Sequence, residues 1–243
     1  PEAHERLGGP PCTYVGHPLI EKFDHIRGLD LEPLRARLDA RPGQPILVVL
    51  PGSRQSEIAR MMDPFGATLT VLRERGVTPV VVVPVVESIR DEIEARAAAW
   101  PIAPVYITGE DDKFRAFRLA DAALATSGTV TLELALAGTP MVVGYKVDRV
   151  GAMVRPFLKT PSVVLANLVL GRNVFAEFLQ EECTGPAFAE RLLPLLSDTP
   201  ERRNQLAALA EIPSRLDVGA EPPSMAAARI VLKCAEAAGQ PKS

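Results

Sequence analysis

The sequence predicts an α/β protein with a Rossmann-like, doubly wound parallel sheet and a helical C-terminal tail. Three observations support this fold class. From residue 46, short β-rich runs alternate with segments of helical length. The runs are almost continuously apolar, as in strands that are buried on both faces of a sheet. After about residue 186 these runs stop. Alternating strands and helices form right-handed βαβ units, which build a doubly wound sheet.

Each element can be placed from its apolar pattern. Strands are expected at Ile46–Leu50, Val80–Pro84, Val105–Thr108, Ala122–Ala125 and Met141–Tyr145, with a weaker one at Ser162–Leu165. The segments between them are expected to be helices: Glu57–Arg75, Glu87–Ala99, Lys113–Leu119, Val130–Ala137 and Arg149–Leu158. Three closing helices are expected at Glu190–Leu196, Glu201–Leu209 and Met225–Ala237, separated by prolines 200, 213, 222 and 223.

Composition narrows the classes of function. The net charge of −3 gives no overall field that would attract nucleic acid. No uncharged apolar stretch approaches the ~20 residues that cross a bilayer, and no secretory signal opens the chain. The three cysteines lie far apart, so we expect neither a metal site nor a disulfide framework. A reduced, cytoplasmic setting fits this cysteine pattern best.

The chain opens at Pro1 without an initiator methionine, and we interpret it as part of something longer. Residues 1–45 are then the remnant of an N-terminal domain, with a hinge and a connecting helix. Residues 46–199 form the Rossmann-like domain, and residues 200–243 the helical tail.

Two short turns carry most of the functional signal. Pro51-Gly52-Ser53-Arg54 follows the first strand, and Thr126-Ser127-Gly128-Thr129 follows the fourth. Each is expected to lead directly into a helix, whose unpaired N–H groups and positive dipole end favour a phosphate. Ligands of open α/β sheets bind beyond the carboxyl ends of the strands, where both turns fall. Together the turns predict a nucleotide diphosphate site.

Each of these residues also has a structural interpretation. Gly52 permits a close backbone approach and Arg54 can form a fork on phosphate, but Ser53 can equally cap a helix while Arg54 pairs with Glu57. Glu133 shares a helical face with Thr129 and lies among apolar residues, where a carboxylate needs a partner. Ribose hydroxyls could be the partner of this carboxylate, and so could a neighbouring arginine or the backbone of an adjacent loop.

Two further segments are ambiguous. Asn167, Arg172, Glu177 and Gln180 could meet sugar hydroxyls or a phosphate edge, although the residues alone favour a solvated acidic helix. Residues 146–159 mix cations with apolar side chains, which suits a membrane surface but more often a helix that packs on the sheet. No Walker loop, Gly-x-Gly-x-x-Gly fingerprint or Gly-x-Ser-x-Gly elbow occurs, which argues against a P-loop protein, an NAD enzyme and a serine hydrolase.

Five ordered blocks resemble lipid-A-disaccharide synthase, a GT-B-type glycosyltransferase. They are Tyr14–Pro18, Leu50–Arg54 with Glu57, Thr126–Glu133, Gly144–Lys146, and Ala166–Leu168 through Phe178–Thr184. The resemblance implies that this chain is the C-terminal, UDP-sugar-binding half of such an enzyme. The family transfers a diacylglucosamine from its UDP conjugate to an acylated glucosamine 1-phosphate (lipid X), forms lipid A disaccharide and releases UDP.

The resemblance also implies roles for residues. Ser53 and Arg54 with Gly52 would hold the pyrophosphate, assisted by the helix end at Ser127, Gly128 and Thr129. Glu133 would take the ribose, and Asn167 and Gln180 would lie near the donor sugar and its phosphate. No cofactor is implied, and no metal is needed if Arg54 and the helix dipole neutralise the phosphates. The acceptor-activating base belongs to the N-terminal half, so the catalytic residue is unknown and we expect this chain alone to be deficient in turnover.

The implied substrates are UDP-diacylglucosamine and lipid X. The implied location is the cytoplasmic face of the inner membrane of a Gram-negative bacterium, where the protein is peripheral. Membrane-surface contact and a homodimer both remain open, and no nucleic-acid partner is expected. Two other functions are compatible with the residues: another UDP-sugar transferase or epimerase of GT-B type, or a non-catalytic nucleotide-binding module.

Overall fold

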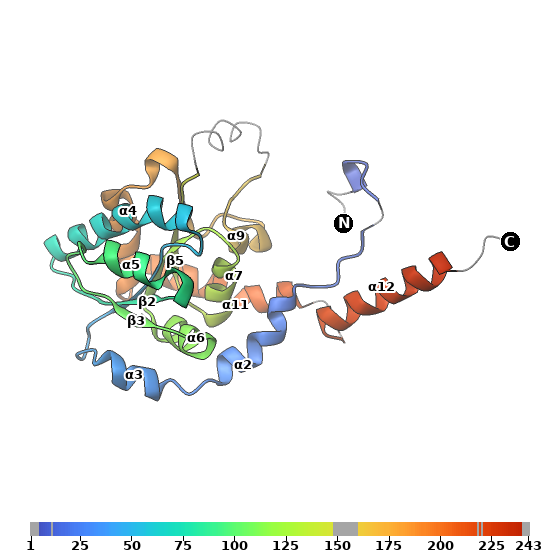
Figure 1. The fold of residues 1–243 in the computed structure, drawn as a ribbon, viewed down its shortest axis with the longest axis horizontal. Coiled ribbons are helices and arrows are strands. Elements are labelled where there is room, and N and C mark those ends of the chain that lie inside the picture. The colour runs from blue at the N-terminus through green and yellow to red at the C-terminus, as the bar shows by residue number, and fades with distance from the viewer. Residues whose placement is uncertain (1–4, 11, 148–159, 218, 220, 240–243) are drawn as a thin grey trace.

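A parallel β-sheet forms the centre of the molecule (Figure 1). The computed structural model describes residues 5–10, 12–147, 160–217, 219 and 221–239. In these residues the sheet has six strands in the order β3-β2-β1-β4-β5-β6, and every neighbouring pair is parallel. The strands are β1 (Ile46–Leu50), β2 (Val80–Pro84), β3 (Val105–Ile107), β4 (Ala122–Thr126), β5 (Met141–Tyr145) and β6 (Ala176–Leu179). The predicted doubly wound fold is confirmed.

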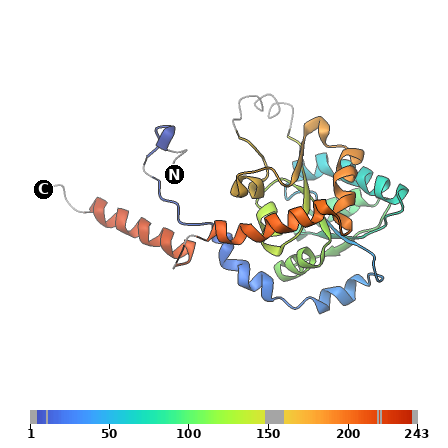
Figure 2. The same ribbon diagram turned by 180° about the vertical axis from the view of Figure 1, so that it is seen from behind.

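Helices cover both faces of the sheet, as Figures 1 and 2 show from opposite sides. One face carries α4 (Gln55–Glu74), α5 (Arg90–Ala97) and α10 (Gly185–Leu192). The other carries α2 (Phe23–Gly28), α3 (Glu32–Leu38), α6 (Glu110–Leu119), α7 (Val130–Ala137), α9 (Leu165–Leu170) and α11 (Pro200–Leu216). Alternate residues of β1 enter opposite cores: Leu47 and Val49 belong to the core that contains α4, and Ile46 and Val48 to the core that contains α6. This double burial explains the continuous apolar runs.

The sixth strand does not lie where the sequence placed it. Ser162 and Val163 are irregular, α9 begins at Leu165, and the strand is Ala176–Leu179, in a segment whose residues favoured a solvated helix. The carboxylate of Glu177 accepts hydrogen bonds from the Ser162 hydroxyl (2.6 Å) and the Val163 N–H (3.1 Å). An edge strand leaves its side chains half-buried, so the polar residues that resemble a helix surface fit there. The helix expected at Arg149–Leu158 lies outside the described residues.

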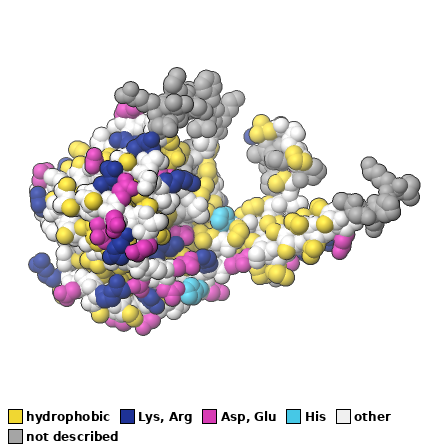
Figure 3. Space-filling view, viewed as in Figure 1, with side chains coloured by type: hydrophobic (Ala, Val, Ile, Leu, Met, Phe, Trp, Pro, Cys, Tyr) yellow, Lys and Arg dark blue, Asp and Glu magenta, His cyan; other side chains and the backbone are white. Residues whose placement is uncertain are grey.

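The C-terminal helices also differ from expectation. α11 continues through Pro213 to Leu216. Proline removes one helical N–H, but Ile212 and Leu216 extend the buried face of the helix and offset that loss. α12 (Pro223–Gly239) projects away from the sheet (Figure 1), with exposed Met225, Val231 and Leu232. Figure 3 shows the resulting band of hydrophobic side chains along it. Among the described helices, none is both long enough and apolar enough to cross a bilayer. Short 3-10 turns occur at Pro18–Lys22, Glu87–Ile89, Gln180–Glu182 and Leu193–Leu196.

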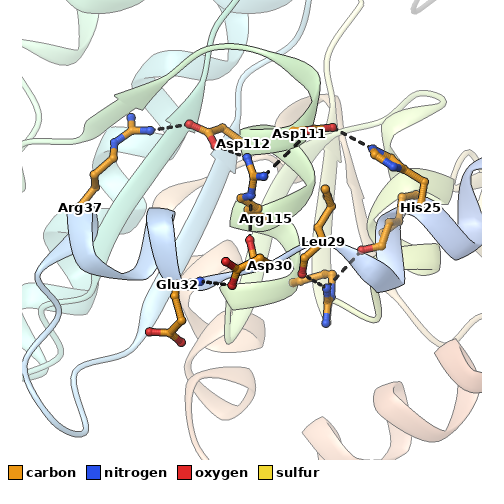
Figure 4. A network of polar contacts seen from close by, with 10 residues as sticks. His25, Leu29, Asp30, Glu32, Arg37, Asp111, Asp112 and Arg115 are labelled. Carbon is orange, nitrogen blue, oxygen red and sulfur yellow. Dashed lines mark hydrogen bonds and ion pairs between the residues drawn. The ribbon is translucent and has the colours of Figure 1, made fainter.

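Residues 17–38 run along α6 and are joined to it by polar contacts (Figure 4). His25 Nε2 lies 2.8 Å from a carboxylate oxygen of Asp111, and Arg37 pairs with Asp112. Arg115 Nε donates to the carbonyl of Asp30 at 2.8 Å. At the first residue of α6, Lys22 pairs with Glu110, and this hydrogen bond lowers the pKa of the Glu110 carboxyl and raises that of the Lys22 ammonium. These contacts hold the N-terminal segment on α6.

The closest contact between two helices predicts a sensitive position. At Gly185, the first residue of α10, an added Cβ would lie 2.6 Å from the carbonyl carbon of Ala67 in α4. Backbone cannot move aside as a side chain can, so we expect Gly185→Ala to lower the free energy of unfolding by about 1–3 kcal/mol. Gly28→Ala is the control, because nothing lies within 4 Å of its Cβ position. Urea unfolding of both variants checks this, and equal stability would contradict the packing.

Candidate functional site

A pocket of about 560 Å³ opens at the carboxyl ends of four neighbouring strands. Its walls come from residues 50–54 and 57 after β1, residues 84–86 and 89 after β2, residues 107, 109, 110 and 113 after β3, and residues 126–130 after β4. The strand order reverses direction between β1 and β4, because β2 and β3 lie on one side of β1 while β5 and β6 lie beyond β4. Doubly wound proteins bind their ligands at this switch point.

The turn after β1 is tightly built around one carboxylate. Oε2 of Glu57 accepts hydrogen bonds from the N–H groups of Ser53 (3.0 Å) and Arg54 (3.3 Å), and Nη1 of Arg54 donates to Oε1 at 2.8 Å. The Arg54 side chain is nevertheless 76% exposed, whereas that of Glu57 is only 11% exposed. The pairing of Arg54 with Glu57 that the sequence allowed is therefore present. Because the guanidinium has five N–H donors, most of it stays available to a ligand.

Gly52 is required by the same contact. Its φ is +118°, in the region that favours glycine, and an added Cβ would lie 2.5 Å from Cβ of Glu57. The sequence indicated that this glycine lets backbone approach a ligand. In the structure, the group that approaches it is the side chain of Glu57.

The turn after β4 leads into α7 as predicted. The Ser127 N–H donates to the Gly144 carbonyl of β5 (3.0 Å), and its hydroxyl donates to the Val163 carbonyl (2.6 Å). Ser127 thus joins the turn to the segment beyond β5. Thr129 is the residue before α7, and an added Cβ at Gly128 would meet nothing within 4 Å. The first turn of α7 therefore opens on the pocket. Within it the N–H groups of Thr131 and Leu132 already donate to the carbonyls of Gly128 (3.1 Å) and Thr129 (2.9 Å), so the N–H groups that can meet a ligand are those of Gly128, Thr129 and Val130, which line the pocket.

Glu133 lies one turn into α7 and already has a partner. Nζ of Lys113, from α6, donates to both carboxylate oxygens of Glu133 at 2.9 Å and lies 4.5 Å from the centre of the Phe114 ring. The sequence allowed an arginine partner, and the observed cation is a lysine. Both side chains are largely buried, and Lys113 lines the pocket. The carboxylate keeps lone pairs that could still accept ribose hydroxyls.

Lys113 was missed because it follows three acidic residues at the start of a short helix, which resembles an ordinary charged surface. The signal that could have found it is topological. α6 follows β3, and its first turn must lie at the same sheet edge as the two phosphate-type turns.

Asn167 and Gln180 are not among the residues that line this pocket. Asn167 is buried: Nδ2 donates to the Phe175 carbonyl (3.0 Å), and Oδ1 accepts from the N–H groups of Val174 (2.9 Å) and Phe175 (3.0 Å). Oε1 of Gln180 accepts from the Val147 N–H at 2.8 Å, and its backbone has a φ of +54°. Both side chains shape the loops that follow β5 and precede β6. Of the other residues predicted to bind the UDP-sugar, all but Glu133 line the pocket, and Glu133 is paired with Lys113, which does line it.

Thr126, the last residue of β4, was named as part of the second turn, but no role in binding was predicted for it. It is 3% exposed and lines the pocket, and its hydroxyl has no hydrogen-bond partner within the described part of the chain. A buried hydroxyl without a partner costs about 1–3 kcal/mol. Such a group at a pocket is an indication of a missing ligand or water.

Fold and pocket together define an α/β protein of the Rossmann-like class, with its pocket at the edge of the sheet where proteins of this class bind their ligands. The model of the lipid-A-disaccharide synthetase family matches residues 7–229. The chain belongs to this family.

Curated relatives agree with this assignment. Lipid-A-disaccharide synthase of Nitrobacter winogradskyi is 49% identical over 234 residues, which cover 96% of this chain and 58% of that protein. The same enzyme of Rhodopseudomonas palustris strain BisB18 is 48% identical, with the same coverage. That of Nitrobacter hamburgensis is 47% identical over all of this chain and 60% of its own length. The chain thus spans about three fifths of these relatives.

Solved structures share the fold at low identity. WaaG, a glycosyltransferase involved in lipopolysaccharide biosynthesis, matches with a TM-score of 0.52 and 19% identity, over 81% of this chain and 49% of that one. The trehalose-6-phosphate synthase OtsA matches with a TM-score of 0.54 and 16% identity, over 82% of this chain and 46% of that one. These similarities support the GT-B type of sheet. In each case this chain corresponds to about half of the solved protein.

The Lys113–Glu133 pair gives a prediction about stability. Because it is largely buried, a double-mutant cycle of Lys113→Met and Glu133→Gln should give a coupling of about 1–2 kcal/mol in the free energy of unfolding. The exposed Arg203–Asp198 pair is the control, and its cycle should give less than about 1 kcal/mol. Urea titrations of the seven proteins, the wild type being common to both cycles, measure both couplings. A coupling for Lys113 and Glu133 no larger than the control would contradict the pairing.

Proposed function

We propose that this chain is the donor-binding part of a lipid A glycosyltransferase, and that its pocket holds the UDP portion of a UDP-diacylglucosamine. One observation carries the proposal: the turn after β1 and the first turn of α7 face one pocket at the switch point of the sheet. Two groups of N–H donors and the exposed Arg54 would meet the two phosphates from neighbouring strands. The family assignment supports the same ligand.

Each pocket residue then has a task. Ser53 and Arg54 bind one phosphate, and the helix end at Gly128 and Thr129 binds the other. Glu133, oriented by Lys113, accepts hydrogen bonds from the ribose hydroxyls. Asn167 and Gln180 act at a distance, by holding the loops beside β5 and β6 in place.

The leaving group is where the reaction most needs stabilisation of charge in its transition state. An acceptor hydroxyl of lipid X attacks the anomeric carbon of the donor, the bond to the β-phosphate oxygen breaks, and its electron pair leaves with UDP. Negative charge grows on the β-phosphate, so Arg54 and the helix end would lower the barrier where their hydrogen bonds strengthen. The proton of the attacking hydroxyl must pass to a general base. We expect that base in the part of the relatives that this chain does not span.

The acyl chains of both substrates place the reaction at a lipid surface. We therefore propose that the protein is peripheral to the cytoplasmic face of the inner membrane. The substrates bring their own hydrocarbon chains, so the pocket itself needs to bind only the polar donor headgroup.

Titration calorimetry with UDP tests the proposal. The chain should bind UDP, and Arg54→Ala should weaken binding by about 1.5–3 kcal/mol, the scale of charge-assisted hydrogen bonds. Arg60→Ala is the matched control: Arg60 lies on the same helix and donates to the Ser56 carbonyl, but it does not line the pocket. Absence of heat with UDP, or equal affinity of the wild type and Arg54→Ala, would contradict the proposal. Comparing UDP-glucosamine conjugates with and without acyl chains would then define the donor.

A further inference from the structure

The carboxylate of Glu57 occupies the donors that a phosphate would need. Its Oε2 accepts from the N–H groups of Ser53 and Arg54, and its Oε1 accepts from the Arg54 guanidinium. These three donors lie at the positive end of α4, a helix of 20 residues. A carboxylate in this position resembles one edge of a bound phosphate in charge and in hydrogen bonding.

The fit of this side chain is close. Only a hydrogen at Gly52 leaves room for it, since an added Cβ would lie 2.7 Å from Oε2. Glu57 is also nearly enclosed, and its negative charge is compensated within the turn. The same pocket contains the buried hydroxyl of Thr126, which has no partner in the part of the chain that the structure describes and independently indicates that a ligand belongs here. The donors of the turn after β1 are thus bound to Glu57, in the same pocket as the Thr126 hydroxyl.

We infer that Glu57 is an intramolecular competitor for the diphosphate, which must displace its carboxylate from Ser53 and Arg54 in order to bind. This inference rests on the proposed function and adds a control on affinity within the same site. Glu57 is a positioning residue: it acts through the donors of Ser53 and Arg54 and takes no part in bond making.

The physical basis is a population shift. If the carboxylate holds the donors most of the time, the observed affinity for an anion falls by the fraction of molecules in which they are open. A single phosphate offers charge similar to that of Glu57 and gains little by displacing it. A diphosphate also engages the helix end at Gly128 and Thr129, so it can displace the carboxylate at a net gain. Glu57 would thereby favour diphosphates over monophosphates.

The test is Glu57→Gln, which keeps the shape of the side chain and removes its charge. An amide oxygen is a weaker acceptor than a carboxylate, so the turn should open more readily. We expect UDP and inorganic pyrophosphate to bind about three- to tenfold more tightly to Glu57→Gln than to the wild type, at one ionic strength. The affinity for inorganic phosphate should rise by at least the same factor, so the ratio of the affinities for pyrophosphate and phosphate should be smaller in Glu57→Gln than in the wild type. Uridine, which has no phosphate, should bind equally to both.

Two controls separate competition from loss of structure. Glu92→Gln removes a carboxylate that also pairs with an arginine, at 3.2 Å, but lies outside the pocket, and it should leave all affinities unchanged. Thermal unfolding verifies that Glu57→Gln is folded. Glu57→Asp is the second variant, since its shorter side chain should lose contact with Ser53 and also bind UDP more tightly.

The outcomes are distinct. If the wild type binds UDP and neither Glu57 variant binds it more tightly, Glu57 is a brace of the turn and the inference is overturned, while the proposed function stands. If neither the wild type nor the variants bind UDP, the proposed function fails and takes the inference with it. Tighter binding of uridine as well would also overturn the inference, because the gain would not come from phosphate.

Discussion

Strands β1 and β4 pair in parallel with Leu50 beside Ala125, and the arrangement of the pocket depends on this pairing. The two strands are far apart in the sequence, and each ends in a short turn followed by a helix. Side-by-side pairing brings the turns within about one strand spacing of each other, roughly 4.8 Å. No long-range side-chain contact is needed to assemble the site. The backbone ladder fixes it, and the two apolar cores on either face hold the ladder in place.

Charges in the pocket are balanced before any ligand arrives. Glu57 compensates Arg54, and Lys113 compensates Glu133, so each partner already has part of its charge satisfied. Binding of an anion at such a site exchanges one set of hydrogen bonds for another, and the measured affinity is the difference between them. Arg54 is the exposed member of its pair, whereas Lys113 and Glu133 are both largely enclosed. An anion can therefore replace the hydrogen bonds of Arg54 in the turn after β1 more easily than those of the Lys113–Glu133 pair beside α7.

Much of the architecture could be predicted from the sequence, because strands buried on both faces produce continuous apolar runs. The first five strands and the two turns follow from that pattern. β6 could not be found in the same way, since an edge strand tolerates polar residues such as Glu177. Within the site, sequence order identified the turns but not their partners: Lys113 approaches Glu133 from another helix, and the Thr126 hydroxyl has no partner among the residues that the structure describes. The family resemblance implied that Asn167 and Gln180 lie near the donor sugar, and only the fold reveals that Asn167 bonds within its own loop and Gln180 to the backbone of Val147 after β5.

The polar contacts between α6 and residues 17–38 determine how far this segment can move relative to the helix. Exposed ion pairs such as Lys22–Glu110 contribute little each, and their attraction fades over about 8 Å at physiological ionic strength. The buried side chains of Ile26 and Leu34 are not screened in this way. Rising salt should leave the segment packed against α6 and α7 while it gains freedom to rock about that line of apolar contacts. Because α6 carries Glu110 and Lys113 at the pocket rim, the same rocking would change the width of the rim.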